Sequence, residues 1–125
     1  MNDPGPYRTA FSDMAKSEAR QDAFFESLVT FMSQHDFDGI DLDWEYPVAQ
    51  DRGGIPADFA NLPKMLARLR KRLNATGRKF GLSITLVSRP RIVFKINGCM
   101  STKLSCAHKP ACIVLVPARV RHCQH

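Results

Sequence analysis

Residues 37–45 restrict the fold of this chain more than any other segment, because apolar and acidic side chains alternate along them with a period of two. In an extended strand, successive side chains point to opposite faces. One face of this segment is apolar and is expected to pack against helices: Ile40, Leu42 and Trp44. The other face carries a row of carboxylates: Asp41, Asp43 and Glu45. The pattern predicts a strand with one face buried.

Two segments with helical periodicity flank this strand. The first runs from Ser17, a suitable N-cap, to His35. Its expected core-facing residues are Phe24, Leu28, Phe31 and Met32. The second runs from about Ala57 to Ala75, where Pro63 is expected to kink or delay the helix. Its expected core-facing residues are Phe59, Leu62, Leu66, Leu69 and Leu73.

A second strand is predicted over Phe80 to Leu86, with its apolar side chains on one face and Gly81, Ser83 and Thr85 on the other. The order helix, strand, helix, strand is typical of parallel sheets, so the expected fold class is α/β. We interpret the basic residues between 68 and 72 as a solvated helix face. Between the helix and the strand, Asn74-Ala75-Thr76 forms an N-glycosylation sequon.

Charge divides the chain near residue 86. Residues 1–86 hold eleven Lys and Arg and all twelve Asp and Glu, a net charge of −1, whereas residues 87–125 hold seven Lys and Arg and no acid, a net charge of +7. The sequence pI of about 9.5 therefore describes the tail, and we expect no nucleic-acid partner for the body. The longest uncharged apolar stretch, Ala111 to Ala118, is too short to span a bilayer, so no membrane partner is expected.

The tail differs from the body in composition as well. Short strands are conceivable at Ile92–Ile96 and Ile113–Val116, but no helical pattern follows either one. All four cysteines lie in this part, at spacings that match no standard zinc finger: Cys99, Cys106, Cys112 and Cys123. We interpret residues 87–125 as a basic, Cys-rich tail that is non-native, from a retained intron or a shifted reading frame. Two alternatives stay open. The tail could be a genuine zinc-binding segment, or the chain could be a small basic interaction protein whose function lies in the tail.

A row of three carboxylates on an otherwise apolar strand is costly, because burying an unpaired charge costs several kcal/mol. Such a row binds a hard metal ion, lies exposed to water, or shares protons in acid–base catalysis. No further ligand lies nearby in the sequence, so we expect no metal. The acid–base interpretation places the reacting group at the carboxyl end of the strand, where Glu45 stands.

The run from Asp38 to Pro47 reads Asp-Gly-Ile-Asp-Leu-Asp-Trp-Glu-Tyr-Pro. It resembles the D-G-x-D-x-D-W-E-Y-P signature of family 18 glycoside hydrolases, the chitinases. The flanking helices, the Arg52-Gly53-Gly54 loop and residues 81–86 are similar to fungal class V chitinases, in the branch related to killer-toxin subunits. The resemblance covers about residues 2–86. It implies a fragment of a (β/α)8 TIM barrel, from about strand 4 to strand 5 with two helices, followed by an unrelated tail.

The resemblance also implies roles for individual residues. Glu45 would protonate the glycosidic oxygen and later activate water. Asp43 would orient the acetamido group of the substrate, whose carbonyl oxygen attacks the anomeric carbon, an exception to the usual two-carboxylate scheme. Asp41 would share a proton with Asp43, and Tyr46 would line the sugar cleft. The remaining motif residues would be structural: Asp38, Gly39 and Trp44.

A complete barrel of this kind needs about 250 residues, so this chain corresponds to roughly a third of one. The expected function is therefore hydrolysis of β-1,4-linked N-acetylglucosamine polymers (chitin) by the parent enzyme, without a cofactor, with the present chain an inactive fragment. The parent family is extracellular, although residues 1–6 show no secretory signal. A non-catalytic chitin-binding relative and an endo-β-N-acetylglucosaminidase acting on N-glycans stay open as alternatives, although the presence of Glu45 counts against the first.

Overall fold

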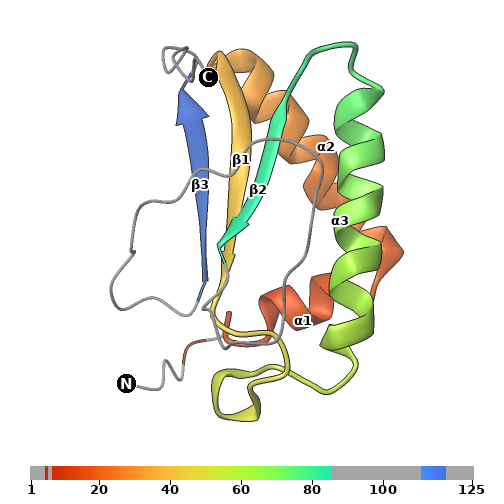
Figure 1. Cartoon of the computed structure of the whole chain (residues 1–125), viewed down its shortest axis with the longest axis vertical. Coiled ribbons are helices and arrows are strands. Elements are labelled where there is room, and N and C mark those ends of the chain that lie inside the picture. The colour runs from red at the N-terminus through yellow and green to blue at the C-terminus, as the bar shows by residue number, and fades with distance from the viewer. Residues whose placement is uncertain (1–4, 6, 86–110, 118–125) are drawn as a thin grey trace, which may run out of the picture.

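The computed structural model of this chain describes residues 5, 7–85 and 111–117. A three-stranded sheet in the order β2-β1-β3 stands beside three α-helices, and α2 and α3 run alongside β1 and β2 (Figure 1). The elements in chain order are α1 (Ala10–Ala15), α2 (Glu18–Gln34), β1 (Phe37–Trp44), the 3-10 turn η1 (Gln50–Arg52), α3 (Asp58–Asn74), β2 (Gly81–Thr85) and β3 (Ala111–Pro117). The α/β class expected from the sequence is confirmed. None of the helices in the described part is long and apolar enough to cross a membrane.

The two long helices lie where helical periodicity predicted them. At the start of α2, the Ser17 side chain accepts a hydrogen bond from the Arg20 backbone N–H at 3.4 Å, which is the expected N-cap. Pro63 lies inside α3 as one element from Asp58, so the helix is not delayed. Each helix presents apolar residues to the sheet, since periodic apolar positions gain most by burial there.

Two residues expected in the core are instead exposed. Phe31 of α2 has 44% of its surface accessible; its ring stacks on Phe37 and is tilted against His35, so the buried stripe of α2 is shifted round the helix. The residues that form it are Gln21, Phe25, Leu28, Val29 and Met32. Phe59 of α3 is 62% exposed, because the first turn of α3 directs Asp58 against α1 instead.

The core lies between the sheet and the helices. Its central strand is β1, whose apolar face is almost completely buried, with Ile40 at 0%, Leu42 at 1% and Trp44 at 5% exposure. Partners come from both helices and include Phe25, Leu28, Met32, Met65, Leu69 and Leu73. The apolar face of residues 37–45 therefore packs as predicted.

Strands β1 and β2 are parallel, with Asp41 opposite Ser83 and Asp43 opposite Thr85. The two backbones approach closely at Gly39, where an added Cβ would lie 2.7 Å from the Gly81 carbonyl oxygen. No side chain fits in that space, so glycine is required at this point of the sheet. The strand–helix–strand unit β1–α3–β2 thus has the connectivity that the sequence order implied.

The three arginines of α3 make polar contacts with neighbouring elements. Arg68 lies 2.6 Å from an Asp22 oxygen and Arg72 lies 2.6 Å from a Glu26 oxygen, both acids being on α2. Arg70 donates to the Phe80 carbonyl at 2.8 Å. Exposed ion pairs of this kind contribute little stability each. Together they pair basic residues of α3 with acidic residues of α2 at successive turns. They also account for the basic face without an anionic ligand.

Helix α1 was not predicted from the sequence. It closes the end of the core beside Trp44, whose ring lies 5.5 Å from that of Phe11, centroid to centroid. Six residues are too few for a helix that is stable alone. Tertiary packing therefore decides its formation.

Strand β3 pairs with the free edge of β1 in the antiparallel sense, with Val114 opposite Asp41. It includes the strand predicted at Ile113–Val116, so this part of the tail prediction is confirmed. The sheet thus contains residues from both sides of the boundary expected at residue 86, and that boundary stays a prediction. The strand predicted at residues 92–96 lies outside the described residues, as do Leu86 and three of the cysteines, Cys99, Cys106 and Cys123.

Candidate active site

The three carboxylates predicted to share one face of β1 differ in burial. Asp43 is 3% exposed, Asp41 is half-buried, and Glu45 follows the last strand residue with 23% of its side chain exposed. Alternate residues on a strand lie about 7 Å apart, so each carboxylate is a neighbour of the next. The row therefore runs from a half-buried position, through a buried one, to an accessible carboxylate at the end of the strand.

Asp41 is held by hydroxyl groups of the adjacent strand. Ser83 Oγ donates to Asp41 Oδ1 at 2.5 Å and Thr85 Oγ1 donates to Oδ2 at 2.8 Å. These donors belong to the face of β2 that the sequence pattern placed opposite its apolar residues. Both oxygens of Asp41 are engaged at once, which fixes the orientation of its carboxylate. Sequence reasoning identified Asp41 but not its two donors, because the register of β1 against β2 was unknown.

Glu45 and Tyr46 begin the loop that follows β1, and the peptide bond between them is cis. Arg52, at the end of η1, faces both side chains. Its Nη1 lies 3.9 Å from Glu45 Oε2, and its guanidinium lies 5.2 Å from the centre of the Tyr46 ring. At 3.9 Å and with both groups partly exposed, the ion pair is weak. Arg52 thus contacts both Glu45 and Tyr46 at the accessible end of the site.

A buried carboxylate, Asp58, organises the loop between β1 and α3. Its Oδ2 accepts hydrogen bonds from Ser12 Oγ at 2.6 Å, from the Ile55 N–H at 2.7 Å and from the Val48 N–H at 3.3 Å. Asp58 has no exposed surface, so these donors replace water at Oδ2, whereas Oδ1 has no hydrogen-bond partner among the described residues. The sequence signal that could have found it is an acid in the first turn of a helix, where the N-terminal end favours negative charge.

A second contact holds the tip of the same loop. Arg8 donates from Nη2 to the Asp51 carbonyl at 2.6 Å and to the Gln50 carbonyl at 3.3 Å. Gly53 has φ +81°, and an added Cβ there would lie 2.5 Å from the Arg8 carbonyl oxygen. The loop that carries Arg52 is therefore fixed against the segment before α1.

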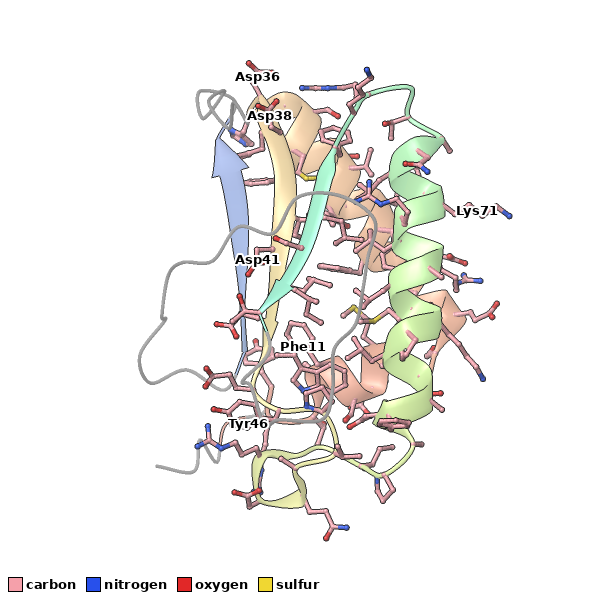
Figure 2. All side chains as sticks on the ribbon, viewed as in Figure 1. Phe11, Asp36, Asp38, Asp41, Tyr46 and Lys71 are labelled. Carbon is pink, nitrogen blue, oxygen red and sulfur yellow. The ribbon has the colours of Figure 1, made fainter. Side chains whose placement is uncertain are left out.

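The other motif residues lie away from this end or within the core. Trp44 packs under α1, and Gly39 lies against Gly81. Asp38 is half-buried at the opposite end of β1 from Tyr46 (Figure 2). Asp41 lies between these two ends, facing β2 (Figure 2). Within the described residues, His, Cys, Asp and Glu side chains do not gather in groups of three or more that could hold a metal ion.

Comparison with known proteins gives the same family that the motif resembles. The sequence profile described as "Glycosyl hydrolases family 18" matches residues 4–104. Chitinase A1 of Niallia circulans is 41% identical over 92 residues, which is 70% of this chain. An endochitinase of Manduca sexta is 37% identical over 73 residues, or 58% of this chain. The killer toxin subunits alpha/beta of Kluyveromyces lactis are 46% identical over 55 residues, or 44% of this chain.

These relatives are much longer than the aligned region. The match covers 13% of chitinase A1, 13% of the endochitinase and 5% of the killer toxin subunits. The chain therefore spans a small part of each of them. The profile match passes residue 86 and ends at residue 104.

Proposed function

The chain belongs to family 18 of the glycosyl hydrolases, and we propose that it carries the catalytic strand of an enzyme that hydrolyses β-1,4-linked N-acetylglucosamine polymers such as chitin. The observation that carries this proposal is the graded row of carboxylates on β1. An accessible Glu45 stands at the carboxyl end, a buried Asp43 lies behind it, and Asp41 is held by two hydroxyl donors. The names of the matched relatives, which include four called chitinase or endochitinase among the first five, support the substrate class.

In the first step, Glu45 donates its proton to the glycosidic oxygen, so the leaving sugar departs as a neutral alcohol. The acetamido carbonyl oxygen of the substrate attacks the anomeric carbon from the other side. An oxazolinium ion forms, with the bond to the leaving sugar broken. The accessible position of Glu45 beside the β1–α3 loop suits a group that must reach a substrate.

Asp43 acts on the acetamido group. Its carboxylate accepts a hydrogen bond from the acetamido N–H and thereby orients the carbonyl oxygen for attack. Its negative charge also stabilises the positive charge that develops on the oxazolinium ring. Asp41 lies next to Asp43 on the same face, and its two hydroxyl donors hold its carboxylate in a fixed orientation.

In the second step, the Glu45 carboxylate removes a proton from water, which attacks the anomeric carbon and opens the oxazolinium ring. The product keeps the anomeric configuration of the substrate, because two displacements occur at the same carbon. Tyr46, beneath the Arg52 guanidinium, offers an aromatic face to a sugar ring at this end of the site.

We also propose that β1 and β2 correspond to strands 4 and 5 of a (β/α)8 barrel. Their parallel pairing on either side of α3 in the chain, with Glu45 at the carboxyl end of β1, supports this assignment. The substrate cleft of such a barrel takes residues from several strands. The 125-residue chain is therefore expected to be inactive by itself.

The test transfers the segment into a complete barrel. The region of chitinase A1 that aligns with this chain is replaced by the matching residues of the chain, and the chimera is assayed with a fluorogenic chitobioside. We expect hydrolysis with retention of the anomeric configuration, which proton NMR of the product measures. Glu45→Gln should lower kcat about 1000-fold or more, since it removes the proton donor but little of the shape. Asp51→Asn, an exposed position in the same loop, is the matched control and should stay within about twofold.

Cooperative thermal unfolding first shows that each chimera is folded. A folded chimera in which Glu45→Gln hydrolyses the substrate as fast as the parent chimera would remove Glu45 from its role. A folded chimera without activity would contradict the proposal for the whole segment.

A further inference from the structure

The sequon Asn74-Ala75-Thr76 stands at the junction of α3 with the turn that leads to β2, and we propose that Asn74 is an acceptor site for an N-linked oligosaccharide. Asn74 is the last residue of α3 and is exposed, as is Ala75. The central residue is not proline, so the sequence meets the requirement for this modification. The proposal does not depend on the hydrolytic function proposed above.

The side chain of Asn74 is available for reaction. Within the described residues, its carboxamide takes part in no hydrogen bond or ion pair, while its backbone carbonyl accepts from the Gly77 N–H at 3.2 Å. The surface around it is open. Gly77 has φ +75°, and an added Cβ there would meet no heavy atom within 4 Å.

Asn74 also lies on the rim of a shallow surface depression of about 460 Å³, to which Arg70, Arg78 and Phe80 contribute. The first sugar residues can therefore lie against the protein without displacing a packed side chain. Phe80 is 4% exposed and lies beneath the Arg78 guanidinium, so the attached sugars meet the arginine side chains and not the aromatic ring.

The site is far from the carboxylates of β1. Helix α3 has 17 residues, which corresponds to about 25 Å from its first turn, near the loop with Arg52, to Asn74. Lys71, one turn before Asn74, lies near the end of α3 away from Tyr46 (Figure 2). An oligosaccharide at Asn74 therefore leaves the catalytic end of the strands uncovered.

Thr76 has two roles at this site. Its Oγ1 donates to the Leu73 carbonyl at 2.6 Å and accepts from the Arg78 N–H at 3.2 Å, so the hydroxyl caps the end of α3 in the folded chain. The same hydroxyl completes the sequon. Removing it changes both the modification and the helix end, whereas changing Asn74 alters the modification alone.

The reaction requires a lipid-diphosphate-linked oligosaccharide as the donor. A bond forms between Asn74 Nδ2 and C1 of the reducing-end sugar, while the bond from C1 to the phosphate oxygen breaks. The lipid diphosphate leaves with the bonding electrons, and one amide proton passes to a base of the transferase. Nothing is oxidised or reduced.

The test uses the full 125-residue chain behind a cleavable secretory leader, synthesised in the presence of endoplasmic-reticulum microsomes. We expect one slower-migrating form inside the vesicles, which peptide-N-glycosidase converts back while leaving Asp at position 74, as read by mass spectrometry. Asn74→Gln should abolish the slower form. Thr76→Ser, which keeps the hydroxyl, should retain it, and Thr76→Val should lose it.

Protection from added protease shows that the chain has entered the vesicles, whether or not it folds there. A protected wild-type chain without the slower form would overturn the proposal. So would a slower form that persists in Asn74→Gln, because the oligosaccharide would then be attached elsewhere.

Discussion

Asp43 is the most deeply buried carboxylate of the β1 row, and its neighbours on either side have different environments. Asp41 is tied to Ser83 and Thr85, whereas Glu45 is accessible and faces Arg52. The same residue type thus serves different purposes at successive positions of one face, because burial and hydrogen-bond donors differ along the strand. Only the last position combines a carboxylate with access for a substrate.

At this scale we predict the effect of Asp43→Asn in the chimera with chitinase A1. The substitution keeps the shape but removes the charge that stabilises the oxazolinium ion, so kcat should fall about 10- to 100-fold. The loss should be smaller than that of Glu45→Gln, which removes the proton donor. Steady-state kinetics on the fluorogenic chitobioside measure both, and a Asp43→Asn chimera as active as the parent would refute the electrostatic role.

Among the elements, the β1–α3 loop depends on contacts that come from outside it. Asp58 receives donors from α1 and from both ends of the loop, and Arg8 holds the loop tip. The position of Arg52 beside Glu45 and Tyr46 therefore rests on packing against the segment before α2. A loop held in this way keeps its functional side chains in place without regular secondary structure of its own.

We predict that Asp58→Ala opens this loop. Three donors lose their acceptor, one of them in the buried contact with Ser12, at a cost of about 1–3 kcal/mol. Limited trypsin digestion should cut after Arg52 about tenfold faster than in the wild-type chain. Gln34→Ala, at an exposed position of α2 outside the loop, serves as control and should be cut at the wild-type rate. Equal rates for the Asp58 variant would show that the loop is held by other contacts.

The stability of the folded chain around helix α1 should depend on pH through Asp13. A hydrogen bond from Lys16, followed by one from Thr9, lowers the pKa of Asp13 below its ordinary value of 3.8. Since the pKa is lower in the folded chain, the contribution of Asp13 is present above pH 3.8 and is lost as the pH falls through the folded value. Lys16→Met should move the pKa of Asp13 upward in an NMR titration of its carboxyl carbon, whereas Lys71→Met on α3 should leave it unchanged.

Across the whole molecule, the sheet has helices on one face only in the described part, and β3 occupies the edge of β1 that β2 does not. Asp41, Ser83 and Thr85 lie on the face opposite the helices, where Thr85 is exposed. A sheet of this size with one covered face has little core for its surface. Its stability is therefore expected to be marginal.

We predict that the 125-residue chain alone gives no measurable hydrolysis of a fluorogenic chitobioside. Proton donation from Glu45 needs a substrate held in a water-excluding cleft, and such a cleft takes residues from several strands of a barrel. The chain should also unfold with weak cooperativity, which calorimetry measures. Hydrolysis by the purified chain that disappears in Glu45→Gln would contradict this expectation.

Removal of β3 should expose the edge of β1. A chain ending at residue 86 leaves backbone N–H and C=O groups of the central strand unpaired, and such edges associate with one another. We expect faster hydrogen exchange at the β1 amides and more light scattering than in a chain ending at residue 117, which keeps β3. Identical behaviour of the two truncated chains would mean that the β1–β3 pairing adds nothing to the fold.

The sequence was enough to predict α2, α3, β1 and β2, and the face of β1 that holds the carboxylates. These features follow from periodicity within a dozen or so neighbouring residues, and periodic burial is a local property of helices and strands. The ten-residue motif at residues 38–47 indicated the family. The domain boundary expected at residue 86 stays a prediction. Within the two helices, Phe31 and Phe59 were placed wrongly, because a stripe of apolar residues does not say where the covering sheet ends.

Contacts between residues about forty or more positions apart became known only from the folded chain. Asp58 with Ser12, Arg8 with Asp51, and Asp41 with Ser83 all depend on how elements pack. The same is true of α1, which is too short to form alone, and of the antiparallel placement of β3 against β1. A side chain's sequence neighbours set its direction on its own element, but its hydrogen-bond partners become known only when another element arrives at a particular register.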